Sequence, residues 1–188
     1  MTKKLVVLGS TRGTDLQFII DKIEVGELDA KIELVLSNRP EAFILERAKN
    51  HNLNTLCIES KGKKRTEFDN LVAIEINKYN PDVIVLIGFM RILSPEFVNK
   101  FVNKIINVHP SLLPKFAGGM DCDVHAEVIA ANELESGCTV HLVTAEVDGG
   151  RIISQKKCEV ELGETPESLK TKVQKLEGEA LVEVIRNW

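Results

Sequence analysis

The first half of the chain alternates short apolar runs with segments of helical periodicity. Apolar runs that end in turn residues predict strands, and apolar residues spaced three or four apart predict helices. The predicted strands are 4–9, 32–36, 54–58 and 82–87, and the predicted helices are 14–23, 42–51 and 66–78. Within 82–87, the residues after Asp82 form a continuous apolar run, which is typical of a strand buried on both faces of a parallel sheet. This alternation predicts an α/β fold with a doubly wound, mostly parallel sheet.

The second half departs from this regular alternation. Its predicted elements are helices at 95–101 and 123–131, and strands at 105–108, 139–143 and 151–160. The last two strands flank a glycine loop and are predicted to be antiparallel to one another. Thr165 and Pro166 fit the N-cap and first position of a final helix that runs towards Trp188. We expect one domain, residues 1–188, with antiparallel strands in its C-terminal part.

Composition excludes several classes of protein. A chain of 188 residues fits one domain, with 44% hydrophobic and 28% charged residues, which is ordinary for a globular protein. A net charge of −4 gives no basic surface for a polyanion, so we do not expect nucleic acid as a partner. No apolar run approaches the roughly 20 residues needed to span a bilayer, and the first run is a short strand rather than a signal peptide. We expect a cytoplasmic protein with no membrane partner.

Cysteines and histidines are not spaced as a disulfide framework or a metal site. The four cysteines, Cys57, Cys122, Cys138 and Cys158, include no C-x-x-C pair, and a chain of this length does not need disulfides. We expect thiols in packing positions, with Cys122 the most exposed. The four histidines, His51, His109, His125 and His141, are not spaced as a zinc module, so we expect no metal.

Residues 107–114, NVHPSLLP, carry the strongest chemical signal. Asn107 and His109 are two residues apart, so on a strand they share one face. The prolines that follow cannot prolong the strand, which places the pair at its carboxyl end, where open α/β sheets bind ligands. Asp148 lies in a glycine loop that could fold back onto the imidazole. An Asn, His and Asp trio suits oxyanion stabilisation and proton transfer, although either motif alone is more often a satisfied polar pair or a tight turn.

Residues 9–14, GSTRGT, join the first predicted strand to the first predicted helix. Free amides and the helix dipole favour an anion at this position, although a sharp turn explains these residues equally well. The segment is not G-x-G-x-x-G, and no acidic residue clearly ends the second strand. A nicotinamide dinucleotide is therefore a poor fit.

Six segments, in order, connect this chain to a known family. They are GTDLQ at 13–17, LSN at 36–38, PDV at 81–83, GFMRILS at 88–94, NVHPSLLP at 107–114, and TVH through DGG at 139–150. With these segments the chain resembles the folate-dependent formyltransferases of purine synthesis that act on glycinamide ribonucleotide. The resemblance implies a Rossmann-like fold and transfer of a formyl group from the cosubstrate 10-formyltetrahydrofolate to the amine of that ribonucleotide.

The resemblance also implies roles for individual residues. Asn107 and a protonated His109 would donate to the oxygen of a tetrahedral intermediate, while Asp148 favours the imidazolium and relays a proton through a bound water. The amides of Gly13, Thr14 and Asp15 would hold the substrate phosphate. The residues implied at the folate are Arg65, Met90, Arg91, Ile92, Leu93 and Asn107, with backbone groups of 91–93 reading the pteridine ring. His141 is expected in the core or behind Asp148, and His125 is unassigned.

Some positions depart from the family or stay open. Asp15 stands where the family usually has Asn, and a carboxylate beside a dianion is unfavourable unless it points away or caps the helix. The loop 115–125 is longer than the commonest form, and Gly118 and Gly119 suit a lid or an ordinary flexible loop. Arg65 ends the basic run 61–65, which could equally be a solvated loop.

Three alternative functions remain open on the sequence. A formyltetrahydrofolate hydrolase or a formyltransferase for another amine would use the same trio, although those relatives carry extra domains. A non-catalytic nucleotide-binding module would not need the trio. We expect small-molecule substrates and a monomer or homodimer.

Overall fold

The computed structural model describes residues 1–119 and 122–188, with the side chain of Cys122 outside the described part. One seven-stranded sheet runs through these residues in the order β3-β2-β1-β4-β5-β6-β7. The strands are β1 Lys3–Gly9, β2 Ala30–Ser37, β3 Thr55–Cys57, β4 Val83–Ile87, β5 Ile105–His109, β6 Glu135–Leu142 and β7 Ile152–Glu159. Neighbours from β3 to β5 are parallel, whereas the β5–β6 and β6–β7 pairs are antiparallel. The predicted fold class, with antiparallel strands in the C-terminal part, is confirmed.

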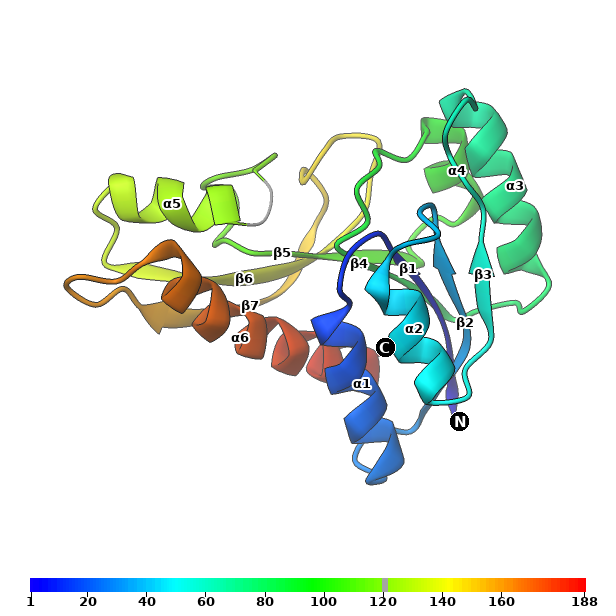
Figure 1. Cartoon of the computed structure of the whole chain (residues 1–188), viewed down its shortest axis with the longest axis horizontal. Coiled ribbons are helices and arrows are strands. Elements are labelled where there is room, and N and C mark those ends of the chain that lie inside the picture. Colours follow the sequence, from blue (N-terminus) through cyan, green and yellow to red (C-terminus); the bar gives the residue numbers. More distant parts are fainter. Residues whose placement is uncertain (120–121) are drawn as a thin grey trace.

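Helices cover both faces of this sheet (Figure 1). They are α1 Thr14–Glu24, α2 Phe43–Asn50, α3 Arg65–Asn77, α4 Pro95–Lys100, α5 Cys122–Ala130 and α6 Pro166–Arg186. One hydrophobic core joins the sheet to α1, α2, α5 and α6, and a second joins it to α3 and α4. The sheet is therefore doubly wound, as the strand and helix alternation predicts.

Successive residues of the central strands face opposite cores. In β1, Leu5 and Val7 pack into the first core, whereas Val6 and Leu8 pack into the second. Because side chains alternate along a strand, burial on both faces requires a continuous apolar run rather than alternation with polar residues. This requirement explains the apolar character of β4, Val83–Ile87.

The start of β6 differs from the sequence prediction. The strand begins at Glu135, four residues before the predicted start at Thr139, and its first residues pair with the end of β7. Glu135-Ser136-Gly137 has the composition of a turn, so its sequence hides the strand. A Cβ atom on Gly137 would lie 1.9 Å from the Lys156 carbonyl oxygen, so the glycine permits the close approach of β7.

Helix α6 begins where the sequence predicts, after an N-cap at Thr165. Thr165 accepts a hydrogen bond from the amide of Ser168, the Ser168 hydroxyl accepts one from the amide of Thr165, and Pro166 occupies the first turn. This capping box satisfies amides that the helix itself leaves unpaired. None of the described helices is long and apolar enough to cross a membrane.

Candidate active site

A cavity of about 660 Å³ opens at the carboxyl end of the parallel strands. It lies where the strand order reverses between β1 and β4, which is the position at which open α/β sheets bind ligands. The residues that the sequence singles out for binding or catalysis all line it: Gly13, Thr14, Asp15, Arg65, Met90, Arg91, Ile92, Leu93, Asn107, His109 and Asp148. Segments distant in the sequence therefore meet at one site.

The first wall of the cavity is the start of α1. Gly13 precedes the helix with φ +67°, and a Cβ atom there would lie 2.5 Å from the Ile44 side chain. Both facts require glycine at this position. No side chain caps this helix, so the amides of its first turn remain available to an anionic ligand.

Asp15 lies in that first turn and is only 6% exposed. Its Oδ1 atom is buried and has no hydrogen-bond partner among the described residues. Burial without such a partner raises the pKa of the Asp15 carboxyl to about 7, because the charged form loses its hydration.

The second wall is the segment that follows β4. The Ser10 hydroxyl donates to Asn38 Oδ1 at 2.5 Å and accepts from the amide of Met90 at 2.9 Å, which ties this segment to the loop after β1. Gly88 has φ +52°, and a Cβ atom there would lie 2.4 Å from the Thr11 hydroxyl. The two loops can pack this closely because Gly88 has no side chain.

Arg91 lines the cavity and stacks its guanidinium on an aromatic ring. Its guanidinium carbon lies 4.4 Å from the centroid of the Phe68 ring, in the core beside α3, and its amide donates to the Phe89 carbonyl at 2.8 Å. The Met90 amide is also engaged, by Ser10. The Met90 and Arg91 amides are therefore already engaged within the protein.

The third wall is a polar cluster at the ends of β5 and β6. His109 Nδ1 lies 3.4 Å from Asp148 Oδ2, and its Nε2–H donates to the Phe116 carbonyl at 2.9 Å. The Gly118 amide donates to Asp148 Oδ2 at 2.8 Å. Asp148 therefore folds back onto the imidazole.

His141 completes the cluster. Its Nδ1–H donates to the Leu142 carbonyl at 2.9 Å, its Nε2 accepts from Asn107 Nδ2 at 3.2 Å, and the same Nε2 lies 3.5 Å from Asp148 Oδ1. The antiparallel register pairs Asn107 with His141, which places both side chains on one face of the sheet. His141 thus lies beside Asp148, where the sequence analysis placed it, and it also orients the Asn107 amide. The contact with Asn107 depends on the β5–β6 register, which the sequence alone does not give.

Partners and burial shift the pKa values of this cluster in different ways. The neighbouring His141 side chain lowers the pKa of Asp148, helped by the Gly118 amide and by His109, although burial opposes them. Burial lowers the pKa of His109, and it outweighs Asp148 and the Phe116 carbonyl, which both raise it. Asp148 favours the imidazolium as predicted, but the net direction opposes a protonated His109 in the ligand-free protein.

The loop after β5 is anchored at its base. The Thr139 hydroxyl donates to the Ser111 carbonyl at 2.7 Å and accepts from the Leu113 amide at 3.0 Å, and Gln155 donates to the Leu113 carbonyl at 3.0 Å. At its far end, the loop meets the cluster through the Phe116 carbonyl and the Gly118 amide. The predicted exposure of Cys122 falls on a side chain outside the described part of the structure.

Helix α6 supplies a fourth wall that the sequence analysis did not identify. Lys170, Gln174 and Glu177 line the cavity, and their spacing of four and three residues places them on one face of the helix. Glu177 lies among the buried residues of α6, which are otherwise apolar or glycine. In the sequence, Glu177 follows Leu169 and Val173 at intervals of four residues, and an acid on this apolar stripe was the available signal for a wall of the site. His125 of α5, which the sequence left unassigned, is buried and lines the cavity too.

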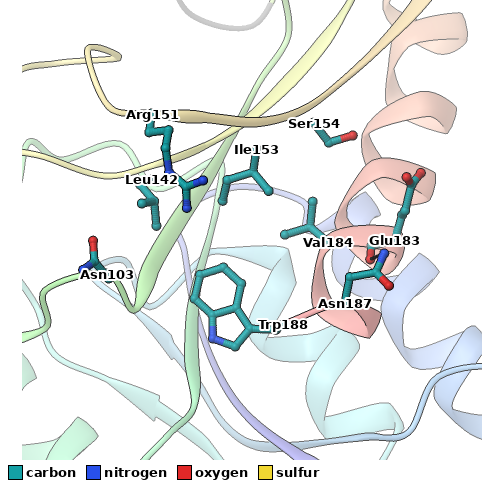
Figure 2. A pocket seen from close by; sticks show the side chains of 9 residues that line it. All are labelled: Asn103, Leu142, Arg151, Ile153, Ser154, Glu183, Val184, Asn187 and Trp188. Carbon is teal, nitrogen blue, oxygen red and sulfur yellow. Dashed lines mark hydrogen bonds between the residues drawn. The ribbon is translucent and has the colours of Figure 1, made fainter.

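A second hollow, of about 400 Å³, lies near the end of α6 (Figure 2). The described residues that line it include no histidine, and Arg151, Glu183 and Asn187 among them are exposed. It lacks the shifted acids and the histidine cluster of the first cavity, which is therefore the candidate active site.

The described residues were compared with the requirements of a metal site and of disulfide bonds. Within 1–119 and 122–188, no group of three or more His, Cys, Asp and Glu side chains is placed to hold a metal ion. Cys57, Cys138 and Cys158 are free thiols. Burial raises the pKa of Cys138 to about 12, so its thiolate is not available as a nucleophile.

Comparisons with known proteins agree with this geometry. Residues 3–185 match the family described as Formyl transferase. The chain is 39% identical over 185 residues to phosphoribosylglycinamide formyltransferase of Escherichia coli (strain K12), covering 98% of this chain and 85% of the relative. It is 37% identical over 171 residues to the trifunctional purine biosynthetic protein adenosine-3 of Homo sapiens, covering 90% of this chain and 17% of that protein. The solved phosphoribosylglycinamide formyltransferase of Coxiella burnetii, in complex with CHES, superposes with a TM-score of 0.93 at 40% identity, covering 99% of this chain and 86% of that one.

Proposed function

Because this chain belongs to the formyl transferase family, we propose that it transfers the formyl group of 10-formyltetrahydrofolate to the amine of glycinamide ribonucleotide in purine synthesis. The observation that carries the proposal is the shared cavity. It joins an uncapped helix terminus suited to a phosphate with an Asn, His and Asp cluster suited to acyl transfer. Its volume of about 660 Å³ lies within the range of small-molecule sites.

The two substrates enter from different walls of the cavity. The amides of Gly13, Thr14 and Asp15 bind the ribonucleotide phosphate, and the polar face of α6 borders the same end. The folate ring lies along residues 90–93, where backbone groups read its edge, with Arg65 at the rim. This arrangement directs the amine and the formyl carbon towards Asn107.

Formyl transfer proceeds through a tetrahedral intermediate. The amine attacks the formyl carbon, a carbon–nitrogen bond forms, and the carbonyl oxygen becomes an alkoxide. The second hydrogen of Asn107 Nδ2 donates to that oxygen, since His141 already accepts the first. Collapse of the intermediate breaks the bond to the folate nitrogen, which receives the proton lost by the amine. Asp148 holds the water that carries this proton.

His109 supplies the second donor to the alkoxide. Its Nε2–H donates to the Phe116 carbonyl in the ligand-free structure, so this carbonyl withdraws when substrate binds. Negative charge on the intermediate then favours the imidazolium, which Asp148 stabilises from Nδ1. The loop that carries Phe116 and Gly118 therefore couples substrate binding to the protonation of His109.

A direct assay tests this function. The purified protein is mixed with 10-formyltetrahydrofolate, with and without glycinamide ribonucleotide, and tetrahydrofolate and formylated ribonucleotide are quantified. We expect equal amounts of both products, formed only when the ribonucleotide is present. Release of formate without an amine would identify a hydrolase instead, and transfer to a different amine would redefine the acceptor.

Other properties follow as proposals from the same assignment. The whole chain acts as one formyltransferase domain in the cytoplasm, with no resident metal, as a monomer or homodimer. The hydrolase alternative is the weaker one, because it leaves the uncapped start of α1 without an anionic ligand.

A further inference from the structure

Asp15 is a buried acid in a site that must accept an anion. It lines the cavity from the first turn of α1, is 6% exposed, and its Oδ1 atom has no hydrogen-bond partner among the described residues. A helix N-terminus by itself favours a carboxylate, but a carboxylate so deeply buried loses its hydration without gaining a counter-charge. Something other than the described protein groups must complete this residue.

Helix α6 places a second acid at the same end of the cavity. Helices α1 and α6 lie side by side (Figure 1), and a Cβ atom on Gly178 would lie 2.5 Å from the Phe18 ring. Asp15 and Phe18 are three residues apart, so they share a face of α1, while Glu177 directly precedes Gly178. The close packing at Gly178 therefore brings buried Glu177 to the end of the cavity that Asp15 lines.

The charges around Asp15 come from several elements. The titratable or charged groups that share its cavity or act on its neighbours are Arg12 before α1, Arg65 and Arg91 beside the segment after β4, His109, His141 and Asp148 of the polar cluster, Glu146 of the loop after β6, His125 of α5, Lys170 and Glu177 of α6, and Cys138 of β6. Asp15 and Glu177 both raise the pKa of the Cys138 thiol, which lies near both carboxyl groups. Arg47 of α2 bonds to Gln17 and to the Arg12 carbonyl.

A phosphate dianion at the start of α1 would meet an ionised Asp15 at short range. Two like charges in a buried site repel strongly, and the cheapest relief is protonation of one of them. Burial already raises the pKa of Asp15 to about 7, so protonation near neutral pH costs little. A protonated carboxyl also turns an acceptor into a donor, which an anionic ligand can use.

We propose that Asp15 makes ribonucleotide binding proton-linked: its carboxyl group is protonated in the complex and donates its hydrogen to an acceptor oxygen of the substrate. The inference rests on the proposed function, since it takes the ligand at α1 to be a phosphate-bearing ribonucleotide. Asp15 then determines specificity, because the site accepts an anionic ligand only when the Asp15 carboxyl group takes up a proton.

The binding test compares the wild type with Asp15→Asn, which keeps the shape and a donor but cannot ionise. The dissociation constant for glycinamide ribonucleotide is measured by calorimetry from pH 6 to pH 9, and the ratio of wild type to variant removes the titration of the substrate itself. We expect a ratio near one at pH 6 that rises by up to about tenfold per pH unit above pH 7. A ratio independent of pH overturns the inference.

Two controls separate the possible failures. Asp21→Asn changes an exposed acid on the same helix and should follow the wild type at every pH. Folate affinity should respond equally to pH in all three proteins. If no protein binds the ribonucleotide while a folate binds, the proposed function fails and the inference falls with it. If all bind with one pH dependence, only the inference fails.

A second measurement needs no ligand. The folded-state pKa of Asp15 lies above the value near 4 of an unfolded chain, so ionisation destabilises the folded protein as pH rises from about 4 through 7. In urea unfolding, Asp15→Asn should have the same midpoint as the wild type near pH 4 and a higher one at pH 8. An equal difference at both pH values contradicts a buried, titrating carboxyl group.

Discussion

The two ends of the cavity shift the pKa of a carboxyl group in opposite directions. The Gly118 amide donates to Asp148 Oδ2, His141 Nε2 lies 3.5 Å from Oδ1, and the pKa of Asp148 is lowered, first by His141. Asp15 is the more deeply buried, its Oδ1 lacks a partner among the described residues, and its pKa is raised to about 7. Partners, rather than burial alone, therefore decide which acid is ionised at neutral pH.

This difference assigns different tasks to the two ends. Asn107, His141 and Asp148 are held close to one another before substrate arrives, as expected for groups that stabilise a transition state, whereas His109 still donates to the Phe116 carbonyl. The start of α1 instead has unsatisfied groups that a ligand completes. Variants at the first end should change turnover, and variants at the second should change binding.

The largest effect is expected for Asp148→Asn. Loss of the charge removes the support for the imidazolium and for the proton relay, so turnover should fall at least about 100-fold while ribonucleotide affinity changes little. Steady-state kinetics and calorimetry measure the two quantities. Addition of His109→Ala should slow the enzyme little further, because residues that act as a unit are not additive. Near-normal turnover of Asp148→Asn would remove this residue from the mechanism.

A smaller effect is expected for His141→Gln. The imidazole holds the Asn107 amide and lowers the pKa of Asp148, so turnover should fall roughly tenfold through lost positioning. The pKa of Asp148 should rise, and the acid limb of the pH–rate profile should move to higher pH. A profile with an unmoved acid limb would show that His141 has only a structural role.

A more modest change in turnover and affinity is expected for Gly118→Ala, in the loop after β5. Gly118 has φ +78° and no atom within 4 Å of a Cβ position, so Gly118→Ala strains the backbone by about 1 kcal/mol without a clash. Because its amide donates to Asp148, turnover and substrate affinity should fall together by several-fold. Kinetics and thermal unfolding are compared with Gly62→Ala, which has a similar φ of +79° and an equally open site. Intact kinetics in Gly118→Ala would make the loop an ordinary surface segment.

The smallest effect is expected for Arg91→Lys. The guanidinium is held on the Phe68 ring, a contact that a lysine can keep, so folate affinity should change by less than about threefold and stability by about 1 kcal/mol. Fluorescence titration and urea unfolding measure these changes. A large loss of folate affinity at unchanged stability would place the Arg91 side chain in the folate site.

Much of the fold could be predicted from the sequence because local patterns determine it. The apolar run 83–87 requires burial on both faces, and Thr165-Pro166 defines the start of α6. The beginning of β6 could not be predicted, because Glu135-Ser136-Gly137 resembles a turn and becomes a strand only by pairing with β7.

The site divides in the same way. The Asn107 and His109 spacing, the Asp148 loop and the Gly13 turn are local signals, and they identified two of the four walls, while the resemblance to the family supplied the third, the segment after β4. The contact of Asn107 with His141 depends on the β5–β6 register, and the position of Glu177 depends on how α6 packs against α1. Neither is a local property. The lowered pKa of His109 also needed the three-dimensional structure, since burial outweighs the neighbouring carboxylate.

The most direct test of the contrast between the two ends is an NMR titration of the side-chain carboxyl carbons of the ligand-free protein, assigned with Asp15→Asn and Asp148→Asn. The account predicts that the Asp15 signal titrates near pH 7 and is lost in Asp15→Asn, while the Asp148 signal titrates below its ordinary value. Titration of both signals together near pH 4 would contradict it.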